Sequence, residues 1–324
     1  MQNFHFLNTQ QLYFEGKAAR KTGNSIGYGL IVFVGFVLCT QIICTYLVLS
    51  GVLSESLAND PLFNTVYSTI VSLVGFLGGG ILIIKSEHRK IGDVISYEPP
   101  QSGDAYTLII IGVGACLAAS YVVGIFASVC ENFGFEPKQP DAGTPDGVFG
   151  FIAYLLMVSV IPAICEEFIF HGAIMQSLRK FGDMTALVVS TILFALMHAN
   201  LIQIPFALVA GFVMGYAALK TDSLIVPMLI HFCNNFIATM FNYVASTTGS
   251  AVVEYLLMLL EFAIIAAAIL LAVKYIKKHG FLRFSPQAQI SSPASLRARI
   301  VFAPAMIPFL CYAVLNVISI QMIG

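Results

Sequence analysis

Long apolar runs separated by short polar segments dominate the chain. A helix that crosses the hydrocarbon core of a bilayer needs about 20 mostly apolar residues, and most of these runs reach or approach that length. We therefore predict an all-α fold, a polytopic transmembrane helical bundle of eight or nine spans around a central polar cavity. The spans are expected at residues 26–50, 66–84, 106–129, 150–178, 186–200, 205–219, 224–243, 253–275 and 301–323.

The spans divide the chain into four regions. Residues 1–24 are mixed and polar and form an N-terminal segment. Residues 25–147 hold spans one to three and an acidic, Gly/Pro-rich loop, and residues 148–243 hold four spans that carry most of the buried polar side chains. Residues 244–324 hold the last two spans. We detect no internal repeat and no soluble domain.

Composition and charge agree with this pattern. Hydrophobic residues make up 58% of the chain and charged residues only 10%, whereas soluble domains carry roughly 25% charged residues. The net charge is −1 and no basic patch indicates nucleic-acid binding. Placing the N-terminus in the cytoplasm puts every Lys and Arg except Lys138 on the inner side, as the positive-inside rule requires. The seven cysteines have no metal-binding spacing and are interpreted as packing residues.

Ionisable side chains inside apolar runs are costly in a bilayer and therefore point to function. At a rise of ~1.5 Å per residue, three of them on separate spans lie roughly 16 to 20 Å from the inner ends of their spans. These three are Glu166, His198 and His231, and their common depth predicts a buried reaction centre. The full set in apolar runs is Glu166, Glu167, Glu261, His171, His198 and His231.

Helical spacing indicates which of these side chains share a face. Glu167 and His171 are four residues apart and are expected to pair. Glu166 points about 100° away from Glu167, so the two carboxylates are expected to have different roles. Glu261 is alone in its span, which favours a structural pairing role. Glycines four apart, at 75/79 and 211/215, predict close helix packing.

Three short motifs follow one another in this region. They are Glu166-Glu167-Phe168-Ile169-Phe170-His171, Phe194-Ala195-Leu196-Met197-His198 and His231-Phe232-Cys233-Asn234-Asn235. Together they resemble the CAAX protease and bacteriocin-processing (CPBP, Abi) family of intramembrane proteases, which includes the type II CAAX prenyl endopeptidases. The resemblance covers about residues 150 to 243. It departs from the family pattern at His171, where the family usually has arginine.

The resemblance implies an intramembrane endopeptidase whose site opens toward the cytosol. In it, Glu166 and His198 would activate the attacking water, while His231 and Asn235 would stabilise the oxyanion. Glu167 would support the site together with His171 and Phe194. Peptide or membrane-protein substrates are implied, with a prenylated tail suggested by the family name alone.

Whether the site holds a metal stays open at this point. Glu166, His198 and His231 would supply a His2Glu zinc set with an open position for water. The alternative, which we favour, is a metal-free glutamate site, because the sequence contains no His-Glu-x-x-His motif.

Three other functions compete with proteolysis by a glutamate. A catalytically inactive family member would act as an immunity or scaffold membrane protein, which the histidine at 171 makes plausible. A proton-coupled transporter would use the same carboxylates and imidazoles as a relay. The string Gly23-Asn24-Ser25-Ile26-Gly27 fits the Gly-x-Ser-x-Gly pattern of serine hydrolases, which requires a strand–turn–helix context.

Overall fold

A computed structural model describes residues 2–94, 96–100, 103–138, 144–145, 147–280, 284 and 289–323. All regular structure in these residues is helical, which confirms the all-α prediction. Eight helices are long and apolar enough to cross a membrane, and a ninth apolar helix of 15 residues, Asp183–Met197, is shorter. The predicted polytopic bundle of eight or nine spans is therefore confirmed.

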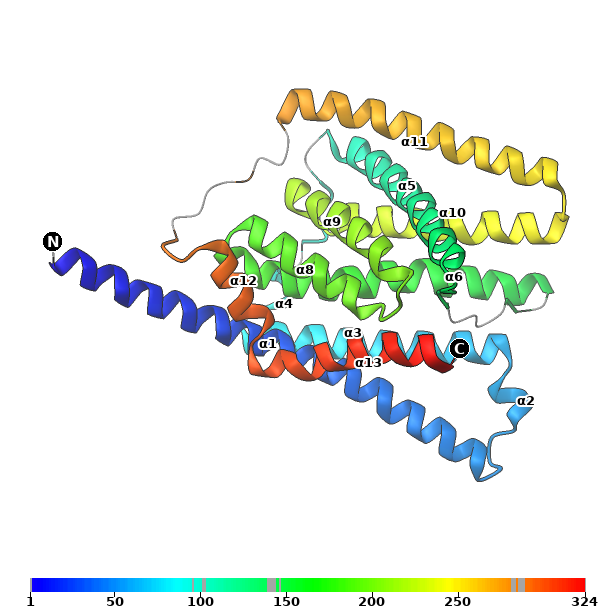
Figure 1. The fold of residues 1–324 in the computed structure, drawn as a ribbon, viewed down its shortest axis with the longest axis horizontal. Coiled ribbons are helices and arrows are strands. Elements are labelled where there is room, and N and C mark those ends of the chain that lie inside the picture. The colour runs from blue at the N-terminus through cyan, green and yellow to red at the C-terminus, as the bar shows by residue number, and fades with distance from the viewer. Residues whose placement is uncertain are drawn as a thin grey trace.

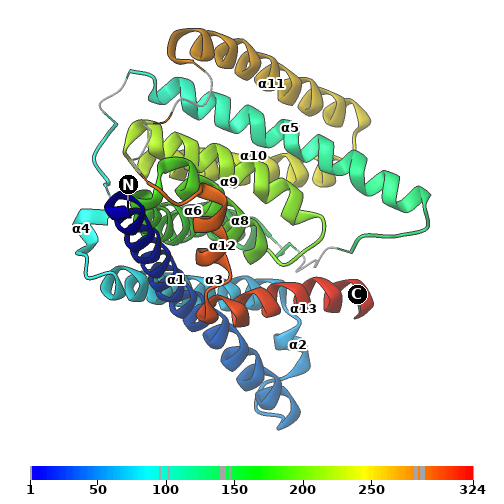
Figure 2. The same cartoon turned by 60° about the vertical axis from the view of Figure 1, so that its left-hand side comes forward.

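The helices pack in three groups (Figures 1 and 2). Helices α1, α3, α12 and α13 form one side, α6, α8, α9 and α10 the centre, and α5 and α11 the other side. The elements are α1 Gln2–Leu49, α2 Glu55–Ala58, α3 Pro61–Ser86, α4 Ile91–Val94, α5 Ala105–Asn132, α6 Gly147–Glu167, a π-helix Phe168–Ile174, α7 Met175–Leu178, a 3₁₀ turn Arg179–Phe181, α8 Asp183–Met197, α9 Gln203–Thr221, α10 Ile225–Thr248, α11 Ala251–His279, α12 Pro293–Val301, a 3₁₀ turn Pro304–Met306 and α13 Ile307–Ile323.

The first helix is longer than the hydrophobic pattern predicts. Helix α1 begins at Gln2 and continues without a break through the polar N-terminal segment into the first span. The last span is shorter than predicted, because α13 begins only at Ile307, after the 3₁₀ turn that contains Pro304. Hydrophobicity marks where a helix can lie in lipid, and it does not mark where a helix that continues into water begins.

The Gly-x-Ser-x-Gly string lies inside α1 and serves close packing. A Cβ on Gly23 would come within 2.4 Å of the carbonyl oxygen of Ile300, and one on Gly27 within 2.3 Å of the carbonyl carbon of Ala305. The Asn24 side-chain oxygen accepts a hydrogen bond from the backbone N–H of Ala305. The strand–turn–helix context that a serine nucleophile needs is therefore not what surrounds this string.

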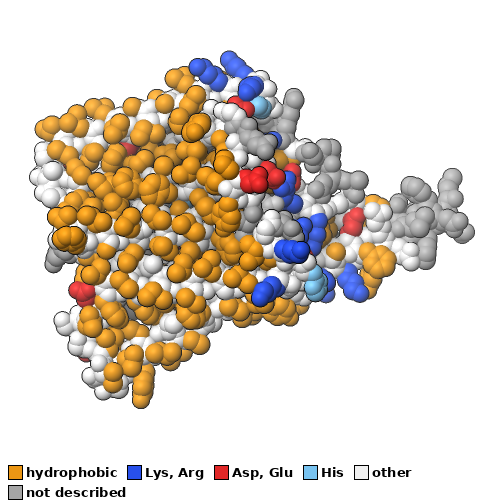
Figure 3. Space-filling view, turned by 180° about the vertical axis from the view of Figure 1, so that it is seen from behind, with side chains coloured by type: hydrophobic (Ala, Val, Ile, Leu, Met, Phe, Trp, Pro, Cys, Tyr) orange, Lys and Arg blue, Asp and Glu red, His pale blue; other side chains and the backbone are white. Residues whose placement is uncertain are grey.

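Charged side chains gather at one end of the bundle, and apolar side chains cover most of the rest (Figure 3). Ion pairs join helices at the charged end, among them Arg179 with Asp222 and Lys278 with Asp104. We refer to this as the basic end. The segregation fits a protein whose apolar belt lies in lipid and whose basic end lies in one aqueous phase.

The glycines of α9 allow that helix to approach α8 closely. A Cβ on Gly211 would come within 2.8 Å of the Phe194 ring, and one on Gly215 within 3.1 Å of the His171 ring. The small-residue spacing therefore predicts close packing correctly. It also has a consequence that spacing does not reveal, because these glycines make room for two side chains of the candidate site.

Candidate active site

A proline in α6 prepares one of the site contacts. Pro162 lies inside α6 and has no N–H, so the carbonyl of Val158 four residues earlier loses its helical partner. The side-chain amide of Asn235 on α10 donates to that carbonyl at 3.0 Å. A carbonyl only accepts, so the amide nitrogen of Asn235 must face Val158. The Asn235 oxygen in turn accepts from the side chain of Asn234 at 3.0 Å.

The two adjacent glutamates lie where α6 passes into a π-helix. Glu167 is the last residue of α6, and the π-helix Phe168–Ile174 follows it directly. Single π-turns inside helices are frequent at functional sites. The Glu167 side chain is fully buried, whereas 17% of the Glu166 side chain is exposed. The two carboxylates thus have different surroundings, as the helical periodicity predicts.

His231 on α10 lies between these carboxylates. Its Nδ1 is 2.8 Å from Oε1 of Glu167, and its Nε2 is 4.0 Å from Oε2 of Glu166. An ionised carboxylate only accepts, so Nδ1 carries the hydrogen that Glu167 receives. Glu167 therefore fixes the ring orientation and turns Nε2 toward Glu166, in the way that a second partner orients functional histidines.

His171 has only a loose contact with Glu167. Its Nε2 is 3.8 Å from Oε2 of Glu167, which exceeds hydrogen-bond distance, and its Nδ1 is 3.3 Å from the hydroxyl of Ser190. Both atoms of the 3.8 Å contact are buried without a hydrogen-bond partner. The expected pairing of Glu167 and His171 is thus present only as proximity. The stronger partner of Glu167 is His231, which the spacing along one helix could not indicate.

His198 lies at the end of α8 and is held by its own helix. Its Nδ1 donates to the carbonyl of Phe194 at 2.9 Å, so Nε2 of the neutral ring is left as an acceptor. The Phe194 ring stands edge-on to His198 at 4.9 Å and to His231 at 6.1 Å between centroids. The aromatic ring thus separates the two imidazoles. Among the contacts that the structure describes, none joins His198 directly to Glu166.

The proposed zinc set is not assembled in this arrangement. In the described part of the chain, no group of three His, Cys, Asp or Glu side chains is placed to hold a metal ion. The Phe194 ring packs between the imidazoles of His198 and His231, and no described contact joins His198 to Glu166. The side chains present do not fit a His2Glu site, and no step of the chemistry below involves a metal.

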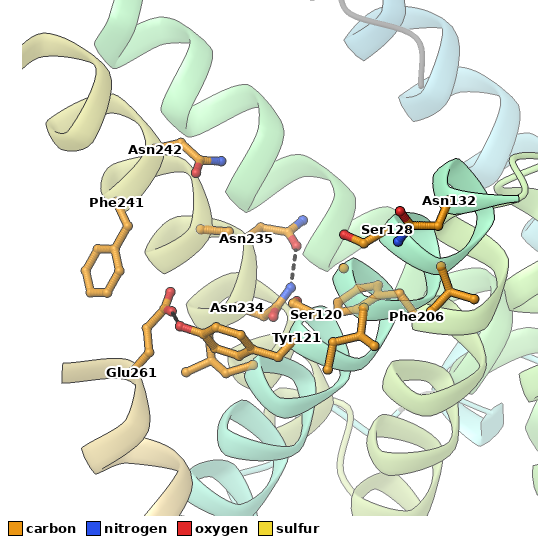
Figure 4. Close-up of a pocket in the computed structure, with 15 residues that line it drawn as sticks. Ser120, Tyr121, Ser128, Asn132, Phe206, Asn234, Asn235, Phe241, Asn242 and Glu261 are labelled. Carbon is orange, nitrogen blue, oxygen red and sulfur yellow. Dashed lines mark hydrogen bonds between the residues drawn. The ribbon is translucent and has the colours of Figure 1, made fainter. Parts of the chain in front are cut away.

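A cavity of about 870 Å³ adjoins the site at Asn235 (Figure 4). It lies between α5, α9, α10 and α11, and the hydroxyl of Tyr121 donates a hydrogen bond to Glu261 in its wall. The prediction that Glu261 has a pairing role agrees with this contact. Its lining is Leu117, Ser120, Tyr121, Gly124, Ile125, Ser128, Val129, Asn132, Phe206, Asn234, Asn235, Ala238, Phe241, Asn242 and Glu261.

Sequence reasoning missed several of these residues. Asn234 and Asn242 are eight residues apart in α10, and both line the cavity. Uncharged polar side chains inside a span are a weaker signal than charged ones, because they cost less in lipid, although they still need partners there. A proline within a span predicts an irregular helix at Pro162. The hydrogen bond from Asn235 to the carbonyl that Pro162 leaves free depends on how α6 and α10 pack, which the sequence does not show.

Fold and site together define a polytopic helical membrane protein with a carboxylate–imidazole cluster buried among its central helices. Residues 148–237 match the family model described as type II CAAX prenyl endopeptidase Rce1-like. This region contains all three motifs, and the match confirms the resemblance to the CAAX protease family. No curated protein and no solved structure matches the chain.

Proposed function

We propose that the protein is an intramembrane endopeptidase that hydrolyses peptide bonds with a water molecule activated by Glu166. The observation that supports this most is the pair formed by Glu166 and His231. A water at hydrogen-bond distance from both atoms, about 2.8 Å from each, spans a gap of this size. Glu166 is the partly exposed carboxylate of the adjacent pair, so water can reach it, while Glu167 is fully buried.

In this mechanism the water adds to the peptide carbonyl and its proton passes to Glu166. The carbonyl oxygen becomes an oxyanion, which needs hydrogen-bond donors. Asn235 uses one of its two amide hydrogens on Val158 and keeps the other for the oxyanion. His231 holds the attacking water together with Glu166, and when its ring is protonated its Nε2–H also donates to the oxyanion. Glu166 then returns the proton to the leaving amine as the C–N bond breaks.

The remaining candidate residues support this centre. Phe194 fixes the spacing of the imidazoles by packing against both, and His198 keeps Nε2 as a proton acceptor on the other side of the Phe194 ring from His231. Glu167 orients His231. His171 lies next to Glu167 but forms no hydrogen bond with it, because the 3.8 Å between its Nε2 and Oε2 of Glu167 is too long.

We further propose that the basic end faces the cytoplasm, together with the N-terminus. The support is the distribution of Lys and Arg, which follows the positive-inside rule in the sequence and gathers at one end in space. The substrate in this proposal is a peptide or a membrane protein. A prenylated tail follows from the family description alone.

The test compares cleavage products in cells that express the wild type, Glu166→Gln or Glu254→Gln. Glu254 is an exposed glutamate in the first turn of α11 and serves as the matched control. New protein N-termini that appear with the wild type and with Glu254→Gln should disappear with Glu166→Gln, at equal amounts of folded protein. N-termini that persist in Glu166→Gln would remove this mechanism.

A non-catalytic membrane protein is the second candidate, and one observation favours it. The buried atoms of Glu167 and His171 that lack partners stand where the family's arginine would supply a planar, charged donor. In that case, cells expressing the wild type and Glu166→Gln would show the same set of N-termini.

A further inference from the structure

The cavity at Asn235 has a largely apolar lining that also carries several polar side chains, in a place where polar groups are costly. Amide and hydroxyl side chains line it on two helices, namely Ser120, Ser128 and Asn132 on α5 and Asn234, Asn235 and Asn242 on α10. Its volume of about 870 Å³ falls within the range typical of ligand sites, roughly 300 to 1,000 Å³. Ser120, Asn234 and Asn235 already have partners within the protein, but Asn234 keeps its carbonyl oxygen and Asn235 one amide hydrogen. The lining therefore fits a ligand that is largely apolar and carries a few polar groups.

The lining residues show toward which end of the bundle the cavity extends. Its α5 residues come from the second half of a helix whose N-terminal end is tied to Lys278 at the basic end. Its α10 residues begin at Asn234 and continue away from the start of α10. The cavity therefore extends from the candidate site toward the end of the bundle opposite to the basic end. The resemblance, by contrast, implies a site open at the cytosolic side.

The basic end is covered near the start of α10. The carbonyl of Ser96 accepts from the backbone N–H of Leu224 at 2.9 Å, and the carbonyl of Glu98 accepts from the hydroxyl of Ser223 at 2.7 Å. The segment that precedes α5 is thus pinned over the beginning of α10. Two specific hydrogen bonds hold it there, and the cavity beside them, of about 250 Å³, is smaller than the cavity at Asn235.

The Glu261 carboxylate favours a ligand that carries a positive charge. Its carboxylate accepts from Tyr121 through one oxygen, Oε2, and the other oxygen is left for a ligand. Figure 4 shows Glu261 and Tyr121 on the opposite side of the cavity from Asn132. A carboxylate within a span normally pairs with another group, and a basic side chain is the strongest such partner in a desolvated site.

We infer that this cavity binds an unwound segment of a membrane-spanning polypeptide, with a basic side chain of that polypeptide at Glu261, and delivers the segment to Asn235. A peptide that leaves the helical form in lipid needs new partners for its N–H and C=O groups. Asparagine side chains carry both a donor and an acceptor and match each of these groups. A prenyl chain would fit the apolar part of the lining but offers no partner to the Glu261 carboxylate. The inference rests on the proposed function, whose substrate class it names.

The binding test uses full-length Glu166→Gln protein in lipid nanodiscs, with a photo-crosslinking amino acid in place of Phe241 or Phe236. Both are phenylalanines of α10, but only Phe241 lines the cavity. The probe is a synthetic single-span peptide, rich in leucine, with a central Gly-Pro pair and one neighbouring lysine. A second probe has methionine instead of the lysine.

Crosslinking of the lysine probe at 241 but not at 236 is the expected result. The lysine probe should compete for the cavity about tenfold better than the methionine probe, because one charge-assisted hydrogen bond gives about this gain in affinity. Glu261→Gln should abolish this preference while the protein stays folded. Equal labelling at 241 and 236, or phospholipid as the main adduct at 241, would overturn the inference.

Crosslinking at 241 and cleavage that depends on Glu166 can be measured independently, so substrate binding in the cavity and proteolysis are tested separately. Crosslinking at 241 without any Glu166-dependent cleavage by the otherwise wild-type protein would leave the cavity assigned and remove the protease. Glu166-dependent cleavage without crosslinking at 241 would keep the protease and remove this route for its substrate.

Discussion

Replacing Pro162 by alanine tests how the fold prepares the site. Alanine restores an N–H that can donate to the Val158 carbonyl within α6, so the helix competes with Asn235 for that acceptor. Pro162→Ala should therefore loosen Asn235 without removing any side chain that takes part in the reaction. Pro162 acts in this account as a positioning residue.

The structure sets the size of both effects. Proline inside a helix is about 3 kcal/mol less favourable than alanine, so the free energy of unfolding should not fall in Pro162→Ala. The hydrogen bond from Asn235 to Val158, 3.0 Å long, is worth about 0.5–1.5 kcal/mol. If it is lost from the transition state, kcat should fall roughly 2- to 12-fold.

The assay measures cleavage of a membrane-embedded peptide together with the thermal midpoint in the same nanodiscs. Pro61→Ala is the matched control, because Pro61 is the first residue of α3, where a missing N–H costs nothing. In an Asn235→Ala background, Pro162→Ala should have no further effect on kcat. Unchanged kcat in the single Pro162→Ala variant, or a further loss in the Asn235→Ala background, would refute this reasoning.

Two further predictions follow from contacts around the site. Glu167→Gln keeps the shape of the side chain but removes the charge that holds His231. Because charge-assisted hydrogen bonds are roughly twice as strong as neutral ones, kcat should fall about tenfold with KM little changed. A rise in KM with kcat unchanged would contradict an orienting role. Gly211→Ala places a Cβ 2.8 Å from the Phe194 ring and should destabilise the protein by about 1–3 kcal/mol in thermal unfolding. Gly78→Ala, whose Cβ would have its nearest neighbour at 3.9 Å, should be neutral or stabilising, and equal effects of the two would contradict the packing account.

The sequence carries enough information for the class of fold and for the helices that hold the site. Apolar runs of span length are a direct consequence of the lipid solvent, so the spans are predicted with errors mainly at their ends. The start of α1 is the largest such error. A helix that leaves the membrane is stabilised by its own backbone hydrogen bonds and by contacts with α12, neither of which appears in a hydropathy pattern.

The site itself was predictable only in part. Ionisable residues in spans marked Glu166, Glu167 and His231, because their cost in lipid has few structural explanations. Which partners they choose depends on how helices rotate against each other. The sequence therefore predicts His171 as the partner of Glu167 by spacing along one helix, whereas the structure places His231 from α10 in hydrogen-bond contact.

The central claim is that Glu166 and His231 act together on one water molecule, and a double-mutant cycle on kcat tests it most directly. The variants are Glu166→Gln, His231→Ala and the combination, measured on one membrane-embedded peptide with equal amounts of folded protein. Groups that work as a unit are strongly non-additive, so the double variant should be about as slow as the slower single variant. Losses that multiply would show that the two side chains act independently and would contradict the account.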